Sequence, residues 1–350
     1  MKIRIKDIAL KANVSTGTVD RVLHSRGDVA ENTRKHVMKI VEEMGYEPNL
    51  IARTLASKKK FHMAVLIPDP EGNLYWKSPL AGMEKAHSEI AGFNAEINFY
   101  PFIIDDEISF HGEFEKLFCQ KPDGIIFSPV FLDTSLKIIQ ICEENRIPYI
   151  FIDANIEGQN NLSYFGQNAS RSGYLAARLM DYAVQTDGEI LIINPSHEKE
   201  VTHHYTKREG GFISYFNGLL NTNKQLKIKS VNANTNSDSE INSVLDKCFK
   251  QNRSIKGIFI TNSKIYKIAR YLSNREINSV VLIGYDLLNE NLSFLNNKTI
   301  DFLIGQKPEE QGYKSVLALF HYLLSGKKPE KTNFSPIDII TKDNFEFYKI

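Results

Sequence analysis

From residue 61 onward, the sequence alternates short apolar runs with longer segments of helical periodicity. The runs at 124–127, 149–152 and 257–260 are apolar or aromatic at nearly every position, which is typical of strands that a parallel sheet buries on both faces. The segments between such runs carry apolar residues three and four positions apart, as amphipathic helices do. Two successive sets of these units predict two doubly wound α/β lobes with mostly parallel sheets.

The expected elements fall into two sets. The first begins with a strand at 61 and contains strands near 96–100, 124–127 and 149–152 and helices near 79–91, 111–119 and 135–145. The second contains helices at 173–183, 207–220, 240–251 and 265–273 and strands at 189–193, 227–232, 257–260 and 280–283, with a strand-like stretch at 301–305.

Polar and aromatic residues gather in the loops that follow these strands. Ligands of doubly wound folds bind beyond the carboxyl ends of the strands, which for two facing lobes is the cleft between them. Aromatic rings stack on the C–H faces of a sugar, while carboxylates, amides and arginine bind its hydroxyls. Singly, each residue could equally be ordinary packing, a loop cap or a surface ion pair. Together they predict a site for a sugar-like effector: Asp69, Tyr75, Trp76, Asp153, Arg208, Asn262, Asp286 and Gln306.

The segment 5–23 predicts two short helices joined by a tight turn. Apolar residues recur at helical spacing on either side of Val14, and Ser15 is a good N-cap for the second helix. The residues Ser15, Thr16, Gly17, Thr18 and Arg21 must then face outward. Small and hydroxylated side chains let a helix N-terminus approach phosphates, and arginine reaches base edges, so a helix-turn-helix fits better than another helical hairpin. A third helix is expected at 33–44.

Charge is unevenly distributed along the chain. Residues 1–60 contain 13 Lys and Arg against 7 Asp and Glu, whereas the remainder contains 30 against 35. The N-terminal segment 1–60, called the head below, is basic, and the remainder of the chain, the body, is mildly acidic. This distribution indicates that the head alone binds a polyanion.

Several kinds of site are not indicated. The three cysteines are far apart, and His203-His204 has no ligand residues at metal-binding spacing, so neither a disulfide framework nor a metal site is predicted. The sequence has no Walker A loop, no G-x-S-x-G and no H-E-x-x-H, so we expect neither an enzyme nor a cofactor. It has no signal-peptide-like start and no run long enough for a membrane span, so we expect a cytoplasmic protein.

The head resembles the LacI/GalR family of bacterial repressors over about 55 residues. The resemblance rests on residues 5–9, Val14-Ser15, Thr18-Val19, residues 21–23, Thr33-Arg34, Val37, residues 45–49, Ala52, Leu55 and Ala56. The body resembles the family's periplasmic-binding-protein-type core, of the ribose-binding kind. That likeness rests on Tyr75-Trp76, Gly82, Asp153, residues 168–173, residues 208–212, Asn262, residues 284–286, Gln306 and Gln311-Gly312.

The resemblance implies a domain plan. A DNA-binding head would occupy residues 1–49, a hinge helix and linker 50–60, and a two-lobed effector-binding and dimerisation domain 61–350. The first lobe would take about 61–160 and 290–324, and the second about 164–286 and 330–350.

The resemblance also implies residue roles. A homodimer would bind a near-palindromic operator, Leu55 of the hinge helix would insert into the minor groove, and lobe closure would alter operator affinity. The implied DNA-contacting residues are Lys6, Ser15, Thr16, Gly17, Thr18, Arg21, His24, Asn49, Ala52 and Leu55. Asn168 joins the effector-binding set.

Three positions depart from the family pattern. Asp20 stands where Ser is usual, Ser263 where many members carry Asp, and Ala30 where a hydroxyl usually caps the third helix. A sugar phosphate or a nucleobase stays open as the effector, although a phosphate would favour more cationic donors than Arg208. The chain could also be a ligand-converting enzyme with a DNA-binding head, or an exported binding protein.

Overall fold

A computed structural model of the chain describes residues 4–23, 27, 29–44, 60–196, 203–218, 225–252 and 254–348. The chain forms two compact units, Met1–Lys58 and Lys59–Ile350. The expected hinge helix at 50–57 lies outside the described residues.

The first unit contains three helices, α1 (Ile5–Ala12), α2 (Thr16–Leu23) and α3 (Glu31–Glu43). They pack around a small core that includes Ile8, Val19 and Val37. Asn13 ends α1 with a left-handed φ of 51°, and Ser15 Oγ accepts a hydrogen bond from Thr18 N at 3.0 Å at the start of α2. The predicted pair of short helices with a tight turn is confirmed.

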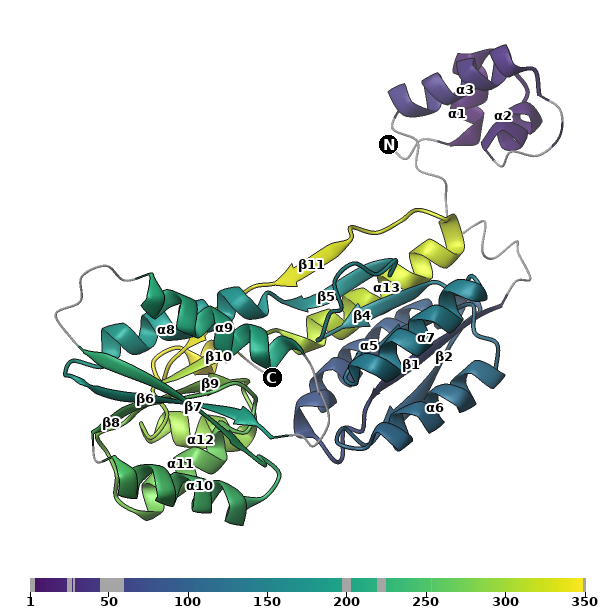
Figure 1. Ribbon diagram of the computed structural model, residues 1–350. Coiled ribbons are helices and arrows are strands. Elements are labelled where there is room, and N and C mark those ends of the chain that lie inside the picture. Colours follow the sequence, from purple (N-terminus) through teal and green to yellow (C-terminus); the bar gives the residue numbers. More distant parts are fainter. Residues whose placement is uncertain are drawn as a thin grey trace. The chain divides into compact units, whose positions relative to one another are not determined.

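The second unit has two lobes, each built on a six-stranded sheet (Figure 1). The first sheet is parallel and has the order β11-β5-β4-β3-β1-β2. Its strands are β1 (Phe61–Pro68), β2 (Ala95–Phe102), β3 (Gly124–Phe127), β4 (Tyr149–Ile152), β5 (Ser163–Gln167) and β11 (Thr332–Ser335). One face packs on α5 (Lys77–Ile90) and α13 (Pro308–Ser325), and the other on α6 (Glu107–Cys119) and α7 (Leu132–Glu144).

The second sheet has the order β12-β10-β9-β8-β6-β7, and only the pairing of β12 is antiparallel. Its strands are β6 (Gly188–Pro195), β7 (Leu226–Ala233), β8 (Ile255–Ile260), β9 (Val281–Tyr285), β10 (Phe302–Gly305) and β12 (Asp338–Ile340). Figure 1 shows α8 (Ala169–Ala183) and α9 (His203–Asn217) on one face, with α10 (Asp238–Gln251), α11 (Ile265–Asn274) and α12 (Asn289–Asn296) on the other. The predicted pair of doubly wound sheets is confirmed.

Each lobe contains a pair of helices that cross at glycines. A Cβ added to Gly82 of α5 would lie 2.0 Å from a backbone oxygen of α13, and one on Gly312 would meet α5 at the same distance. In the second lobe, a Cβ on Gly173 of α8 would lie 1.9 Å from the carbonyl oxygen of Arg208, and Gly211 of α9 meets α8 at 2.0 Å. Only glycine permits two helix backbones to approach this closely. The contact between α8 and α9 therefore fixes the backbone that carries Arg208.

The chain passes between the lobes three times, after β5, after β10 and after β11. Gln167 lies at the first of these three passages between the lobes, and its side chain is buried. Its Nε2 atom donates to Gly305 O at the second passage and to Pro336 O at the third, each at 3.0 Å. One amide therefore ties all three crossings together and defines the hinge.

The lobe limits differ from those expected. We expected 290–324 in the first lobe, but α12 and β10 belong to the second, and only α13 of that stretch returns to the first. We expected the second lobe to begin near 164 and to include 330–350, but β5 and β11 pair in the first sheet. The crossings are short, and no change of composition marks them.

Candidate functional site

A cavity lies between the two lobes where their strands end. It encloses about 490 Å³ of empty space, which includes an opening to solvent. Its lining contains seven of the nine predicted effector-binding residues: Tyr75, Trp76, Asp153, Arg208, Asn262, Asp286 and Gln306. The structure therefore brings together residues that are up to 231 positions apart in the sequence.

The first lobe provides an aromatic wall. The short 3₁₀ helix η1 (Leu74–Trp76) follows β1, and the side chain of Asn73 caps it by accepting from Tyr75 N at 3.3 Å. The rings of Tyr75 and Trp76 meet edge to face, with centroids 5.5 Å apart, and both are buried. Ile104 and Val130 extend this apolar surface.

Asp153 is the carboxylate of the first lobe. It follows β4 with a left-handed φ of 65°, and its Oδ1 accepts a hydrogen bond from the hydroxyl of Tyr75 at 2.8 Å. Burial raises the pKa of Asp153, an effect that the charge of Arg208 and the Tyr75 hydrogen bond reduce. Tyr75 thus holds a desolvated carboxylate at the edge of its own aromatic ring.

Arg208 is held on three sides within the second lobe. Its guanidinium lies 3.8 Å above the ring of Tyr285, Nη1 donates to Thr261 O at 2.7 Å and Nη2 donates to Gln306 Oε1 at 2.7 Å. The hydroxyl of Tyr285 in turn shares a 2.9 Å hydrogen bond with Ser172 Oγ. The orientation of the guanidinium is therefore set before any ligand arrives.

Asp286 is the carboxylate of the second lobe. It follows β9 with a left-handed φ of 70°, and Gln306 Nε2 donates to both of its oxygens, at 2.9 and 3.1 Å. Burial raises the pKa of Asp286 to about 7, although Arg208 and the Gln306 hydrogen bond oppose the rise. Gln306 therefore links the carboxylate to the guanidinium.

Asn262 lines the cavity but also braces its own loop. Its Nδ2 donates to Thr235 Oγ1 at 2.9 Å, and its Oδ1 accepts from Lys264 N at 3.0 Å. Ser263 lies beside it in the lining. Asn262 thus has a structural role whether or not it also contacts a ligand.

Two predicted residues lie outside the cavity lining. The Oδ1 atom of Asp69 accepts from Glu71 N at 3.1 Å within its own turn. Asn168 is the N-cap of α8 and accepts from Arg171 N at 3.0 Å. The likeness to the family pointed to Asn168, whereas its place just before a helix is the signal of a cap.

Six lining residues were not predicted to contact the effector: Asn73, Ile104, Val130, His204, Tyr205 and Ser263. Asn73 and Ser263 lie in strand-end loops, where the sequence predicts that ligand-binding residues gather, whereas His204 and Tyr205 lie in the first turn of α9. Ile104 and Val130 carry no polar group that would distinguish them from core residues.

In the head, Lys6, Ser15, Thr16, Gly17 and Arg21 are exposed, and Thr18 is half-buried. These residues are therefore accessible, as a DNA-contacting surface requires, with the Thr18 hydroxyl 2.9 Å from Ser15 Oγ. The other residues predicted to contact DNA lie outside the described residues: His24, Asn49, Ala52 and Leu55.

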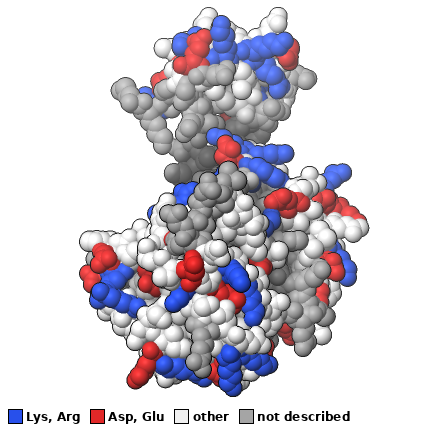
Figure 2. Space-filling model, turned by 60° about the vertical axis from the view of Figure 1, so that its left-hand side comes forward, with Lys and Arg blue, Asp and Glu red and all other residues white. Residues whose placement is uncertain are grey.

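Charged side chains of both signs are intermixed on the face of the two-lobed unit that Figure 2 shows. Among the described residues, no group of three or more His, Cys, Asp and Glu is placed to hold a metal ion. In the same part of the chain, no helix combines the length and apolarity that crossing a membrane requires.

Two sequence models of known families match the chain. Residues 4–49 match that of the bacterial regulatory proteins of the lacI family, and residues 63–328 match that of a periplasmic binding protein domain. Catabolite control protein A of Streptococcus mutans is 28% identical over 196 residues, which cover 51% of this chain and 56% of that protein. The chain spans about half the length of the curated relatives it matches.

Two solved structures are similar to the chain. One, from Bacteroides fragilis and assigned as a LacI transcriptional regulator, is 34% identical with a TM-score of 0.76, and the match covers 83% of this chain and all of that one. The glucose-galactose binding protein GanP of Geobacillus stearothermophilus has a TM-score of 0.73 at 20% identity, with 82% of this chain and 99% of GanP covered. The second likeness is one of fold.

Proposed function

Because this chain belongs to the LacI family of bacterial regulatory proteins, we propose that it is a DNA-binding transcription regulator of carbohydrate-metabolism genes. A sugar-like effector would bind in the cleft between the lobes, and the closure that follows would change the affinity of a homodimer for its operator. The observation that carries the effector proposal is the pairing of an aromatic wall in one lobe with a braced guanidinium and carboxylate in the other.

The charges of the cleft favour a neutral effector. Asp153 and Asp286 line it together with Arg208, whose Nη1 and Nη2 atoms already donate to protein oxygens. A phosphate would meet two carboxylates and one guanidinium, so binding it would bring like charges together in a desolvated site. Sugar hydroxyls can donate to both carboxylates, and the C–H face of a sugar can stack on Trp76. An unphosphorylated sugar therefore ranks above a sugar phosphate or a nucleobase.

The exposed polar start of α2 supports the DNA-binding part. Ser15, Thr16 and Gly17 leave the helix N-terminus accessible, and Arg21 is exposed one turn later. Such a helix fits the major groove, where arginine can recognise guanine through two hydrogen bonds. We place the protein in the cytoplasm, where its operator would be, and we propose that it binds its effector without converting it.

The DNA-binding part is tested by selecting bound duplexes from a library of random sequences with the full-length protein. A near-palindromic sequence should be enriched, and Arg21→Ala should weaken binding to it by about tenfold or more, as loss of a base contact does. Lys39→Ala removes the same charge from an exposed position on α3 and is the matched control. Failure to enrich any sequence would overturn the assignment as a regulator.

The effector part is tested by calorimetry with glucose, galactose, arabinose and ribose and with their phosphates. At least one neutral sugar should bind, and Trp76→Ala should abolish its heat of binding. Tighter binding of a phosphate than of its parent sugar would contradict the neutral-effector proposal.

A further inference from the structure

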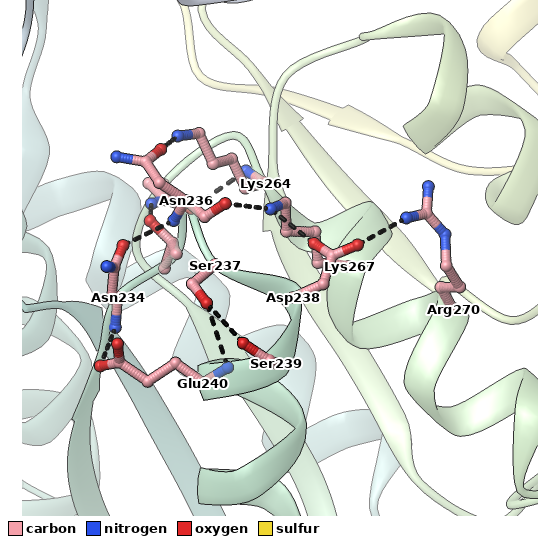
Figure 3. A network of polar contacts seen from close by, with 11 residues as sticks. Asn234, Asn236, Ser237, Asp238, Ser239, Glu240, Lys264, Lys267 and Arg270 are labelled. Atoms are coloured by element: carbon pink, nitrogen blue, oxygen red, sulfur yellow. Dashed lines mark hydrogen bonds and ion pairs between the residues drawn. The ribbon is translucent and has the colours of Figure 1, made fainter.

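The loop between β7 and α10 in the second lobe forms a polar network that the effector site does not use (Figure 3). Asn234 Oδ1 accepts from Asn236 N at 3.0 Å, and Ser237 caps α10 through Glu240 N at 3.2 Å. Lys267 of α11 donates from Nζ to Asn236 O at 2.9 Å and also pairs with Asp238 at 2.6 Å. The second lobe alone therefore fixes the position of Asn236.

The side chain of Asn236 uses both ends of its amide. Its Oδ1 accepts from Lys264 Nζ within the second lobe, and its Nδ2 donates to Asp105 Oδ2, which lies in the loop after β2 in the first lobe. The contact joins residues 131 positions apart and spans the cleft. The charge of Asp105 also raises the pKa of Lys264, against the larger effect of burial, so the attraction between the lobes includes a charge pair.

The position of this contact in the two sheets is informative. The hinge crossings leave from β5 and β10, whereas β2 and β7 are the opposite edge strands of their sheets. In the first sheet, β5 and β2 are four strand spacings apart, and in the second sheet β10 and β7 are also four spacings apart. At ~4.8 Å per spacing, each distance is about 19 Å. Rotation by about 3° about the hinge would then separate the two sides by about 1 Å, enough to break a hydrogen bond of ordinary length. An opening rotation of this size would therefore break the contact.

We propose that Asp105, Asn236 and Lys264 form a closure latch that stabilises the closed lobes and thereby regulates effector release. The proposal rests on the proposed effector site for its consequence, but the latch itself acts without effector. Asn236 is held in place by the second lobe before closure, so little side-chain entropy is lost when the latch forms. A second contact between the lobes is the Lys207–Glu157 ion pair at 2.6 Å, whose side chains are 38% and 78% exposed.

Trp76 reports on the latch directly. It is the single tryptophan of the chain, lines the cleft and is 2% exposed. Because Trp76 lines the cleft, opening of the lobes should increase its exposure, so quenching of its fluorescence by acrylamide measures opening in the absence of effector or operator. Asn236→Ala and Asp105→Ala should each raise the quenching constant. Ser239→Ala, which removes a hydroxyl in the first turn of α10 that lies 2.9 Å from Ser237 Oγ, should leave it unchanged.

A variant with both substitutions shows whether Asp105 and Asn236 act through their contact with each other or independently. If Asp105 and Asn236 act on each other, Asp105→Ala combined with Asn236→Ala should raise quenching no more than either change alone. Fully additive effects, or no change in either single variant, would overturn the proposal. Circular dichroism melting checks that each variant is folded, and Asp105→Asn offers a milder change in the opposite lobe.

If a neutral sugar binds, the latch variants should weaken its affinity by about fivefold, mainly through faster release, because one exposed charge-assisted contact is worth about 1 kcal/mol. Unchanged release with increased quenching would overturn the regulatory part of the proposal. If no sugar binds at all, the quenching result still decides whether the latch exists, while the proposed effector fails on its own.

Discussion

The first lobe contributes rings and one carboxylate to the cleft, whereas the second contributes a connected set of charged and amide groups. In the first lobe, Tyr75 holds Asp153 by a single hydrogen bond. In the second, Arg208, Gln306 and Asp286 are joined in series, and Tyr285 supports the guanidinium from below. The second lobe therefore presents a preorganised polar surface, and the first faces it with a largely aromatic surface that carries one carboxylate. Preorganisation of this kind lowers the cost of ordering side chains when a ligand binds.

The largest effect is expected when Arg208 is removed, because the polar network of the second lobe depends on it. Arg208→Ala leaves Thr261 O and Gln306 Oε1 without these donors and Asp286 without its nearest positive charge. Effector affinity should fall by 30-fold or more, about 2–5 kcal/mol. Fluorescence titration of Trp76 measures the loss.

Arg275 offers a matched control for this change. It lies 3.9 Å above the ring of Tyr271 and pairs with Asp246 at 2.8 Å, but it is exposed and lies outside the cleft lining. Arg275→Ala should leave effector affinity unchanged. Equal losses in the two variants would show that a stacked arginine matters for lobe stability rather than for the site.

The buried carboxylate of the second lobe should appear in the pH dependence of stability. The pKa of Asp286 is about 7 in the folded protein and near 3.9 in an unfolded chain, so the folded state binds more protons between these values. Stability falls as pH rises through that window. The Asp286→Asn variant lacks this contribution, so its unfolding free energy should exceed that of the wild type by a larger margin at pH 8 than at pH 4.

Urea unfolding at several pH values, without effector, measures this difference. Asp69→Asn is the comparison, because that carboxylate lies in a turn outside the cavity lining. A difference between the wild type and Asp286→Asn that did not vary with pH would argue against the desolvation of Asp286.

The smallest effect is expected in the first lobe. Tyr75→Phe keeps the aromatic wall and removes only the hydroxyl that donates to Asp153. Effector affinity should fall about fivefold, since a typical hydrogen bond within a protein contributes about 1 kcal/mol. Calorimetry with the sugar that binds best would measure this change. A loss as large as that of Arg208→Ala would remove the contrast between the two lobes.

Local patterns in the sequence were enough to predict the two-lobed class, the three-helix head and most of the cleft. Strands β3 and β4 were predicted to the residue because strands buried on both faces must be apolar throughout. Tyr75, Asp153, Arg208 and Asp286 could be found because strand ends in such folds meet at one place. Short, partly polar strands such as β5 and β11 carry no comparable pattern and were missed.

The connections between these parts follow from the packing of the folded chain. The three lobe crossings, the use of Asp69 and Asn168 as local hydrogen-bond acceptors, and the contact of Asp105 with Asn236 depend on which strands become neighbours. Strand pairing is a choice among distant segments of similar composition, so local periodicity cannot report it. The burial pattern of a strand or helix is visible in the order of its own residues, whereas contacts across a hinge exist only after both sheets have formed.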